Sequence, residues 1–80
     1  MNAEIFEDTM RSFIRHRPFQ PFVVELEEGQ EILVDDPHAV ALSGGGTGGA
    51  GYIGADEVYM ISAELVRAIR PVRQNEEVRN

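Results

Sequence analysis

The residues best suited to acid–base or metal chemistry lie in one short segment of the chain. Asp35, Asp36 and His38 are close together, and Glu25 or Glu31 could lie nearby in the fold. Carboxylates and an imidazole can hold a metal ion that activates water, so a small enzyme would bind a metal here. The spacing, however, matches no zinc motif such as H-E-x-x-H. We therefore expect a turn with a capping aspartate and an exposed imidazole, and we predict no metal, no cofactor and no catalytic residue.

Two other patterns that could carry chemistry are weak. The serines have no neighbouring base and no nucleophile-elbow motif; they are Ser12, Ser43 and Ser62. The glycine-rich segment 44–51 formally satisfies G-x-G-x-x-G at Gly44, Gly46 and Gly49, but no helix and no Gly-Lys-Ser/Thr sequence follows it. We expect a flexible hairpin loop there rather than a phosphate-binding loop.

The net charge of −7 is unevenly distributed along the chain. Such an acidic surface repels phosphate, and Tyr52 and Tyr59, which could stack on a base, have no basic residues between them; nucleic-acid binding is therefore disfavoured. All the basic residues apart from histidine are arginine, which suits bidentate pairing with carboxylates, so arginines of one copy could meet the acidic hairpin of another. Residues 18–43 have no arginine or lysine and carry the acids Glu25, Glu27, Glu28, Glu31, Asp35 and Asp36.

The length and composition predict one small domain. Its 80 residues include no cysteine, so there is neither a disulfide framework nor thiolate chemistry. Because a domain of this size has a thin hydrophobic core, a partner or self-association could supply further burial. The N-terminal residues lack the basic and apolar regions of a signal peptide, and no apolar run approaches the roughly 20 residues that span a bilayer. We expect a cytoplasmic protein that does not bind a membrane.

The segment Pro18 to Asp35 has the clearest strand alternation and the clearest turn. A two-residue loop at Glu28-Gly29 would place carboxylates on the apolar face, whereas a three-residue loop, Glu27-Glu28-Gly29, pairs apolar residues with one another. We predict the three-residue loop, with Gly29 in the left-handed conformation. The resulting core face consists of Phe22, Val24, Leu26, Ile32 and Val34.

The other face of this hairpin places Glu25 opposite Glu31 and Val23 opposite Leu33. Like charges directly opposite each other are mildly destabilising. Either the two carboxylates extend into water, which we favour, or an arginine or another cation is held between them. The apolar pair Val23–Leu33 indicates that this face is partly covered.

A helix is expected over residues 3–16. Phe6, Met10 and Phe13 follow helical spacing, and Asn2 is a suitable N-cap. Pro18 disfavours helical geometry at the preceding residue and so ends the element.

Further strands are expected at residues 39–43, 50–53, 57–61 and 65–70. A turn at residues 54–56 joins the second and third of them, and Val66 and Ala68 share one face of the last. Residues 1–71 therefore form a single domain. Residues 72–80 are polar without periodicity and are predicted to be a disordered tail.

Two resemblances add to these patterns. The first is carried by a set of residues spread over most of the chain: Arg17-Pro18-Phe19, Pro21-Phe22, Val24, Leu26, Gly29, Ile32, Val34, Pro37-His38, Val40-Ala41-Leu42, Ile61, Val66, Ile69 and Pro71. This set is similar to a widespread family of small bacterial proteins of unassigned function, which implies a fold over residues 5–71 and no site.

The second resemblance is carried by Leu26 to Ile32 and by Tyr59-Met60-Ile61 with Val66 and Ile69. These segments resemble the strands of Sm-like proteins, which have an N-terminal helix and a small barrel, form rings and bind RNA. The RNA-chaperone members have Tyr-Lys-His where this chain has Tyr59-Met60-Ile61.

Together these patterns predict a mainly β domain with one N-terminal α-helix (α+β), built as a strongly bent antiparallel sheet or as a small SH3-like or Sm-like barrel. The predicted function is non-catalytic: a protein-interaction or assembly module that binds a protein partner, or itself, through an edge strand or the apolar part of its hairpin. The alternative is an Sm-like nucleic-acid-binding protein that uses Arg11, Arg15, Arg17 and the arginines of the last strand. The candidate interaction surface comprises Glu25, Glu31, Val23, Leu33, Arg67 and Arg70.

Overall fold

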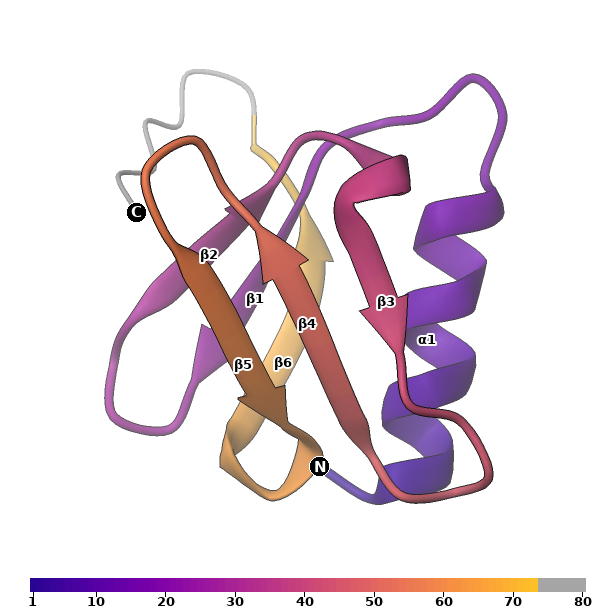
Figure 1. Ribbon diagram of the computed structural model, residues 1–80, viewed down its shortest axis with the longest axis vertical. Helices are drawn as coiled ribbons and strands as arrows, with labels where there is room; N and C mark the ends of the chain where they lie inside the picture. The colour runs from indigo at the N-terminus through magenta and orange to yellow at the C-terminus, as the bar shows by residue number, and fades with distance from the viewer. Residues whose placement is uncertain (74–80) are drawn as a thin grey trace.

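The computed structural model describes residues 1–73 as one helix and six strands (Figure 1). Single-turn 3-10 helices precede the third strand (η1, Pro37–Ala39) and the last (η2, Ala63–Leu65). The predicted helix and strands are all present, with each bound shifted by no more than one residue. The helix and strands are α1 (Ala3–Arg15), β1 (Phe22–Leu26), β2 (Glu31–Val34), β3 (Val40–Leu42), β4 (Gly49–Ile53), β5 (Val58–Ser62) and β6 (Val66–Pro71).

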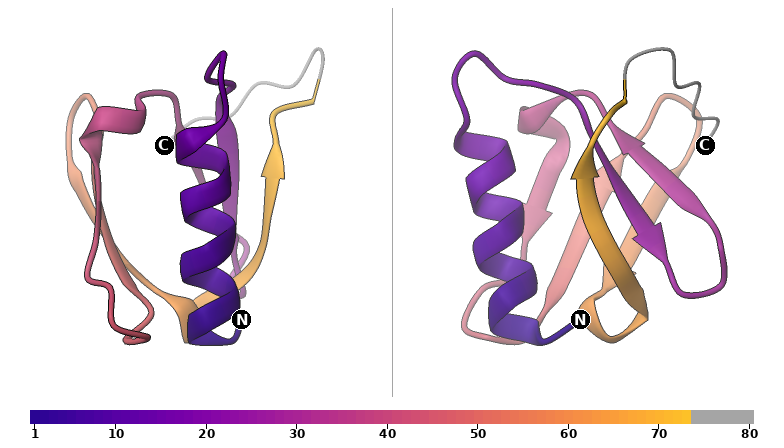
Figure 2. Two further views of the ribbon diagram at one scale, coloured as in Figure 1. Left: turned by 90° about the vertical axis from the view of Figure 1, so that its right-hand side faces the viewer. Right: turned by 180° about the vertical axis from the view of Figure 1, so that it is seen from behind.

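Helix α1 begins where the sequence predicts. The side chain of Asn2 accepts hydrogen bonds from the backbone N–H groups of Glu4, at 2.8 Å, and Ile5, at 3.3 Å, which satisfies donors that the first turn leaves open. Phe6 and Met10 are fully buried. Figure 2 shows α1 lying along one side of the molecule, where it covers the gap between the two sheets.

The predicted register of the β1–β2 hairpin is confirmed. Phe22 lies opposite Val34, and the backbone N–H of Leu26 donates to the carbonyl of Gln30 at 2.8 Å, as the three-residue loop requires. Gly29 has a φ of 101°, a conformation that favours glycine. The expected core face is therefore the one that faces the interior.

The strands form two antiparallel sheets, with the orders β2-β1-β6 and β3-β4-β5. The domain is thus α+β as predicted, but the expected barrel is not confirmed, because no ladder joins one described sheet to the other. Figure 2 shows the two sheets face to face. Their inner faces and α1 contribute to one hydrophobic cluster, so the bend expected within one sheet is replaced by the packing of two.

Strand β6 departs from the predicted alternation. Its pairing with β1 shifts register between Glu25 and Leu26, which is a β-bulge. As a result Val66 and Ile69 both pack with the core, and the expectation that Val66 shares a face with Ala68 is wrong. The bulge places Arg67 and Arg70 on the outer side of the sheet.

A buried carboxylate holds the glycine-rich loop between β3 and β4 against α1. Glu7 accepts hydrogen bonds from the backbone N–H groups of Gly48, at 2.8 Å, and Gly46, at 3.3 Å, and it also pairs with Arg11 at 3.2 Å. The bond from Gly48 contributes most to lowering the pKa of Glu7, and burial opposes it. The loop expected to be flexible is therefore docked on the helix.

The structure tests only the first two residues of the predicted disordered tail, residues 72–80. The backbone N–H of Val72 donates to the carbonyl of Pro21 at 3.3 Å, so the first residue of the predicted tail is tied to the domain. The rest of that prediction, at residues 74–80, lies outside the described residues. Within residues 1–73, no helix is long and apolar enough to cross a membrane.

Candidate functional site

The structure brings the predicted interaction residues together on the outer face of the β2-β1-β6 sheet. Val23 lies between Leu33 on β2 and Arg70 on β6, and Glu25 lies opposite Glu31. Val23 has no exposed surface and Leu33 is half-buried. The apolar part of this face is therefore already covered in the folded domain.

The opposed carboxylates hold an arginine between them. Arg70 donates from Nε to Glu25 Oε2 and from Nη2 to Glu31 Oε2, the latter at 3.0 Å. Arg67 donates to the other oxygen of Glu25 at 3.0 Å. These hydrogen bonds lower the pKa of Glu25, and the bond from Arg70 has the larger effect. An arginine is thus held between the two carboxylates, and the prediction that Glu25 and Glu31 extend into water is wrong.

This pairing changes what the face can do. Two carboxylates and two arginines neutralise one another within the chain, and the inner guanidinium, that of Arg70, is mostly buried. Their charges are therefore already matched, and a second copy is not needed to match them.

The opposite outer face, on the β3-β4-β5 sheet, is uncharged and exposed. Ala41 on β3, Gly51 on β4 and Met60 on β5 lie side by side across the sheet, and Ile53 lies opposite Val58. Because side chains alternate between faces along a strand, these residues point away from the core. The exposed fractions are 83% for Met60, 64% for Ile53 and 61% for Val58.

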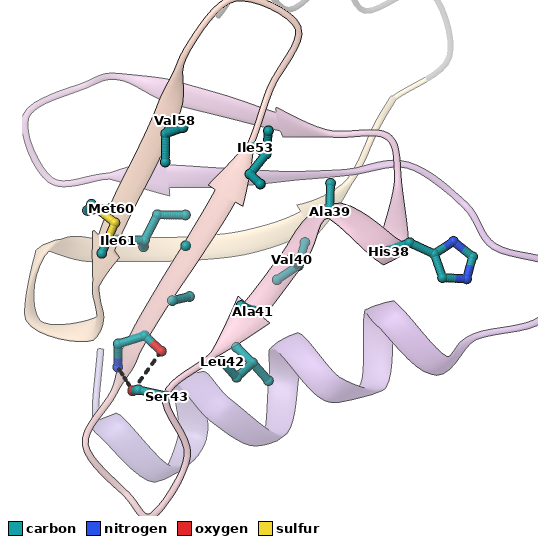
Figure 3. A pocket seen from close by; sticks show the side chains of 13 residues that line it. His38, Ala39, Val40, Ala41, Leu42, Ser43, Ile53, Val58, Met60 and Ile61 are labelled. Atoms are coloured by element: carbon teal, nitrogen blue, oxygen red, sulfur yellow. Dashed lines mark hydrogen bonds between the residues drawn. The ribbon is translucent and has the colours of Figure 1, made fainter.

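These side chains border a groove of about 540 Å³ (Figure 3). Gly49 and Gly51 have no side chains and so leave the middle strand low between β3 and β5. We call this groove the apolar trough. It is bounded by Ala41, Ser43, Gly49, Gly51, Ile53, Val58 and Met60, with His38 and Ala39 at one end.

A second, smaller cavity of about 250 Å³ lies at the turn that joins β4 to β5. The Tyr52 hydroxyl donates to Asp35 Oδ1 at 2.8 Å, and the Tyr59 hydroxyl donates to Glu57 Oε1 at 3.1 Å. Burial, followed by these bonds to carboxylates, raises the pKa of both tyrosines. Their hydroxyls hold carboxylates in place, and the rings stack at 6.3 Å rather than offering a free face to a base.

The segment singled out for metal chemistry forms the expected turn. Asp36 Oδ1 accepts a hydrogen bond from the backbone N–H of His38 at 2.9 Å and so caps η1. The imidazole is 90% exposed and projects away from the sheet (Figure 3). Among residues 1–73, no three histidine, aspartate or glutamate side chains are grouped to hold a metal ion.

The serines lie apart from one another. Ser12 is exposed on α1, and Ser62 ends β5. Ser43 bonds within the glycine loop, where its hydroxyl lies 2.5 Å from that of Thr47 and donates to the Gly49 carbonyl at 3.0 Å. The loop glycines bind an anion, but it is the chain's own Glu7 carboxylate.

Two functional features escaped the sequence-based prediction. The buried role of Glu7 has no local signal, because its partners lie far along the chain. The apolar trough did have a signal, in that β5 alternates Val58 and Met60 with Tyr59 and Ile61, so both of its faces are apolar.

Comparisons of the chain with protein-family models, curated proteins and solved structures give no match. The resemblances to the small bacterial family and to Sm-like proteins therefore stay predictions.

Proposed function

We propose that this chain is a non-catalytic protein-interaction module whose binding surface is the apolar trough. The observation that carries the proposal is the set of contiguous exposed side chains Ile53, Val58 and Met60 on an uncharged face, in a chain of net charge −7. Contiguous exposed apolar side chains offer a partner a surface to cover, and their burial drives association.

The charged face supports the choice of the trough. Arg67 and Arg70 are paired with carboxylates, and Arg11 is paired with Glu7 and with Asp8 at 3.1 Å. A nucleic-acid-binding surface needs arginines that can reach phosphates. Of the other arginines of that alternative, Arg15 and Arg17 are exposed at the end of α1, and Arg17 donates to the backbone carbonyls of Ile14 and His16. Two exposed arginines make a small basic surface in a chain of net charge −7, so we propose only the protein-binding function.

The test is affinity capture from native lysate with mass measurement, using matched surface variants. The double variant Val58→Thr/Met60→Gln makes the trough polar while keeping side-chain size and, at position 58, the β-branched shape that suits a strand. The control is Ile5→Gln, which removes an apolar side chain of similar exposure, 58%, from α1.

We expect the unmodified chain and Ile5→Gln to retain the same partner, and the double variant to lose it while its circular dichroism stays unchanged. The measured mass shows whether the partner is a second copy. A partner that is captured equally by all three proteins would overturn the proposal.

A further inference from the structure

Resting on the proposed function, we propose that the apolar trough takes a short segment of a partner protein that carries apolar side chains followed by a lysine or arginine. The apolar side chains lie over Gly49 and Gly51. The basic side chain reaches the end of the trough where β4 turns into β5.

That end of the trough is acidic. Ile53 and Val58 border it, and the turn between them carries Asp56 and Glu57. Asp35 and Glu57 line the second cavity, which lies at the same β4–β5 turn, and Asp36 caps η1. In Figure 1 the β4–β5 turn and η1 lie at the same end of the sheet. We call Asp35, Asp36, Asp56 and Glu57 the acidic end.

The acidic end differs from the carboxylates of the domain that are paired with arginines. Glu7, Asp8, Glu25 and Glu31 each form an ion pair with an arginine. Within residues 1–73 the carboxylates of the acidic end form no ion pair with an arginine, and Asp36 Oδ1 lies 3.5 Å from Nδ1 of His38. All four residues of the acidic end are exposed. Their charge is thus available to a cation supplied by a partner.

The size of the trough favours a peptide segment over a second copy of the domain. Strands about 4.8 Å apart and residues about 3.4 Å apart give β3, β4 and β5, of three, five and five residues, a flat area of roughly 210 Å². A stable protein–protein interface takes about 800 Å² of accessible surface from each partner. The trough is well below that size, which suits a few side chains of a linear segment.

The floor of the trough allows it to be filled without disturbing the fold. A Cβ added at Gly51 would lie 3.8 Å from Met60 Sδ, an ordinary van der Waals contact, and its φ is not in the left-handed region. Valine suits a strand position. The backbone therefore accepts a Cβ at this position, and we expect Gly51→Val to fill the trough without moving the strand.

The test starts with a phage-displayed library of random eight-residue peptides selected against the unmodified protein. The selected consensus peptide is then synthesised with a fluorophore and titrated by anisotropy. We expect a consensus with consecutive or alternating apolar residues and a lysine or arginine at one end. Gly51→Val should weaken its binding at least about tenfold. Val58→Thr/Met60→Gln should weaken it equally, and this double variant tests the proposal if Gly51→Val does not fold.

Charge is tested by a second matched pair. Asp56→Asn/Glu57→Gln should weaken binding about threefold to thirtyfold, and the loss should shrink in high salt, as expected for exposed ion pairs. Glu27→Gln/Glu28→Gln makes the same change of charge at the β1–β2 turn and should leave binding within about twofold, since long-range attraction alone is screened.

Several results would overturn the inference. A consensus without a basic residue, or binding indifferent to Asp56→Asn/Glu57→Gln, refutes the basic segment but leaves the trough as the binding surface. A library that yields no peptide sensitive to Gly51→Val refutes a peptide occupant, and the capture experiment then judges the proposed function separately. A dimer in sedimentation equilibrium that Gly51→Val dissociates would identify the occupant as a second copy.

Discussion

Substitution of Gly48 by alanine should reveal how closely the glycine loop packs on the helix. Gly48 has a φ of +75°, and a Cβ added there would lie 2.9 Å from the Cβ atoms of both Ala3 and Ala63. The left-handed conformation costs an alanine about 1–2 kcal/mol. Overpacking adds about 1–3 kcal/mol. We therefore expect Gly48→Ala to lower the free energy of unfolding by about 2–5 kcal/mol.

The matched control is Gly45→Ala in the same loop. Gly45 has a φ of +63°, but nothing lies within 4 Å of an added Cβ. It should therefore lose only the conformational part, about 1–2 kcal/mol. The difference between the two variants, about 1–3 kcal/mol, isolates the contact with α1 and η2.

Urea unfolding at neutral pH, followed by circular dichroism, measures both free energies. In a domain of this size each kcal/mol corresponds to about 4–8 °C in Tm, so thermal scans should separate the variants by about 4–24 °C. If the two variants are equally stable within about 0.5 kcal/mol, the close packing of Gly48 against α1 and η2 is refuted.

Three further predictions concern the buried and paired polar groups. Glu7→Gln should lower the free energy of unfolding at neutral pH, and the difference from the unmodified protein should close as the pH falls from 4.5 through the lower pKa of folded Glu7, because protonation, like the amide, removes the negative charge and one acceptor oxygen. A difference that persists in urea unfolding at about pH 2 would contradict this. Arg70→Met leaves two opposed carboxylates and should cost about 1–3 kcal/mol, whereas Arg67→Met, at a more exposed side chain, should cost at most about 1 kcal/mol; equal losses would show that Arg70 does not bridge the pair. The raised pKa of Tyr52 contributes stability that is lost as the pH rises above its usual value of 10, so Tyr52→Phe should remove part of the alkaline destabilisation, measured as the change in Tm between about pH 9 and pH 11.

The sequence was sufficient to predict the β1–β2 hairpin because its two loop lengths have opposite consequences. One register places carboxylates on the core face and the other places Val24 against Ile32, so burial decides between them. The sequence was insufficient for β6, where Val66, Ala68 and Ile69 are all apolar. A strand that is apolar at consecutive positions does not say which residues face inward, and the bulge beside Glu25 decided it.

The sites were harder to predict than the strands because they depend on distant partners. Glu7 lies one helical turn before Arg11, which is typical of an exposed ion pair. Its burial depends on Gly46 and Gly48, which belong to a segment that looks like a flexible linker in sequence. The trough was missed for a different reason: the pattern of β5 is compatible with either face being inside.

The docked glycine loop also decides where this domain can accept extra sequence. Tolerance to insertion depends on the burial and hydrogen bonding of the affected backbone rather than on glycine content. A tag inserted after Gly45 would pull Gly46 and Gly48 away from Glu7. The same tag after Glu28, in the exposed β1–β2 turn, leaves those bonds intact and lies on the sheet that does not carry the trough. An internal affinity tag for partner capture therefore belongs in the β1–β2 turn after Glu28, and the glycine-rich loop should not receive an insertion.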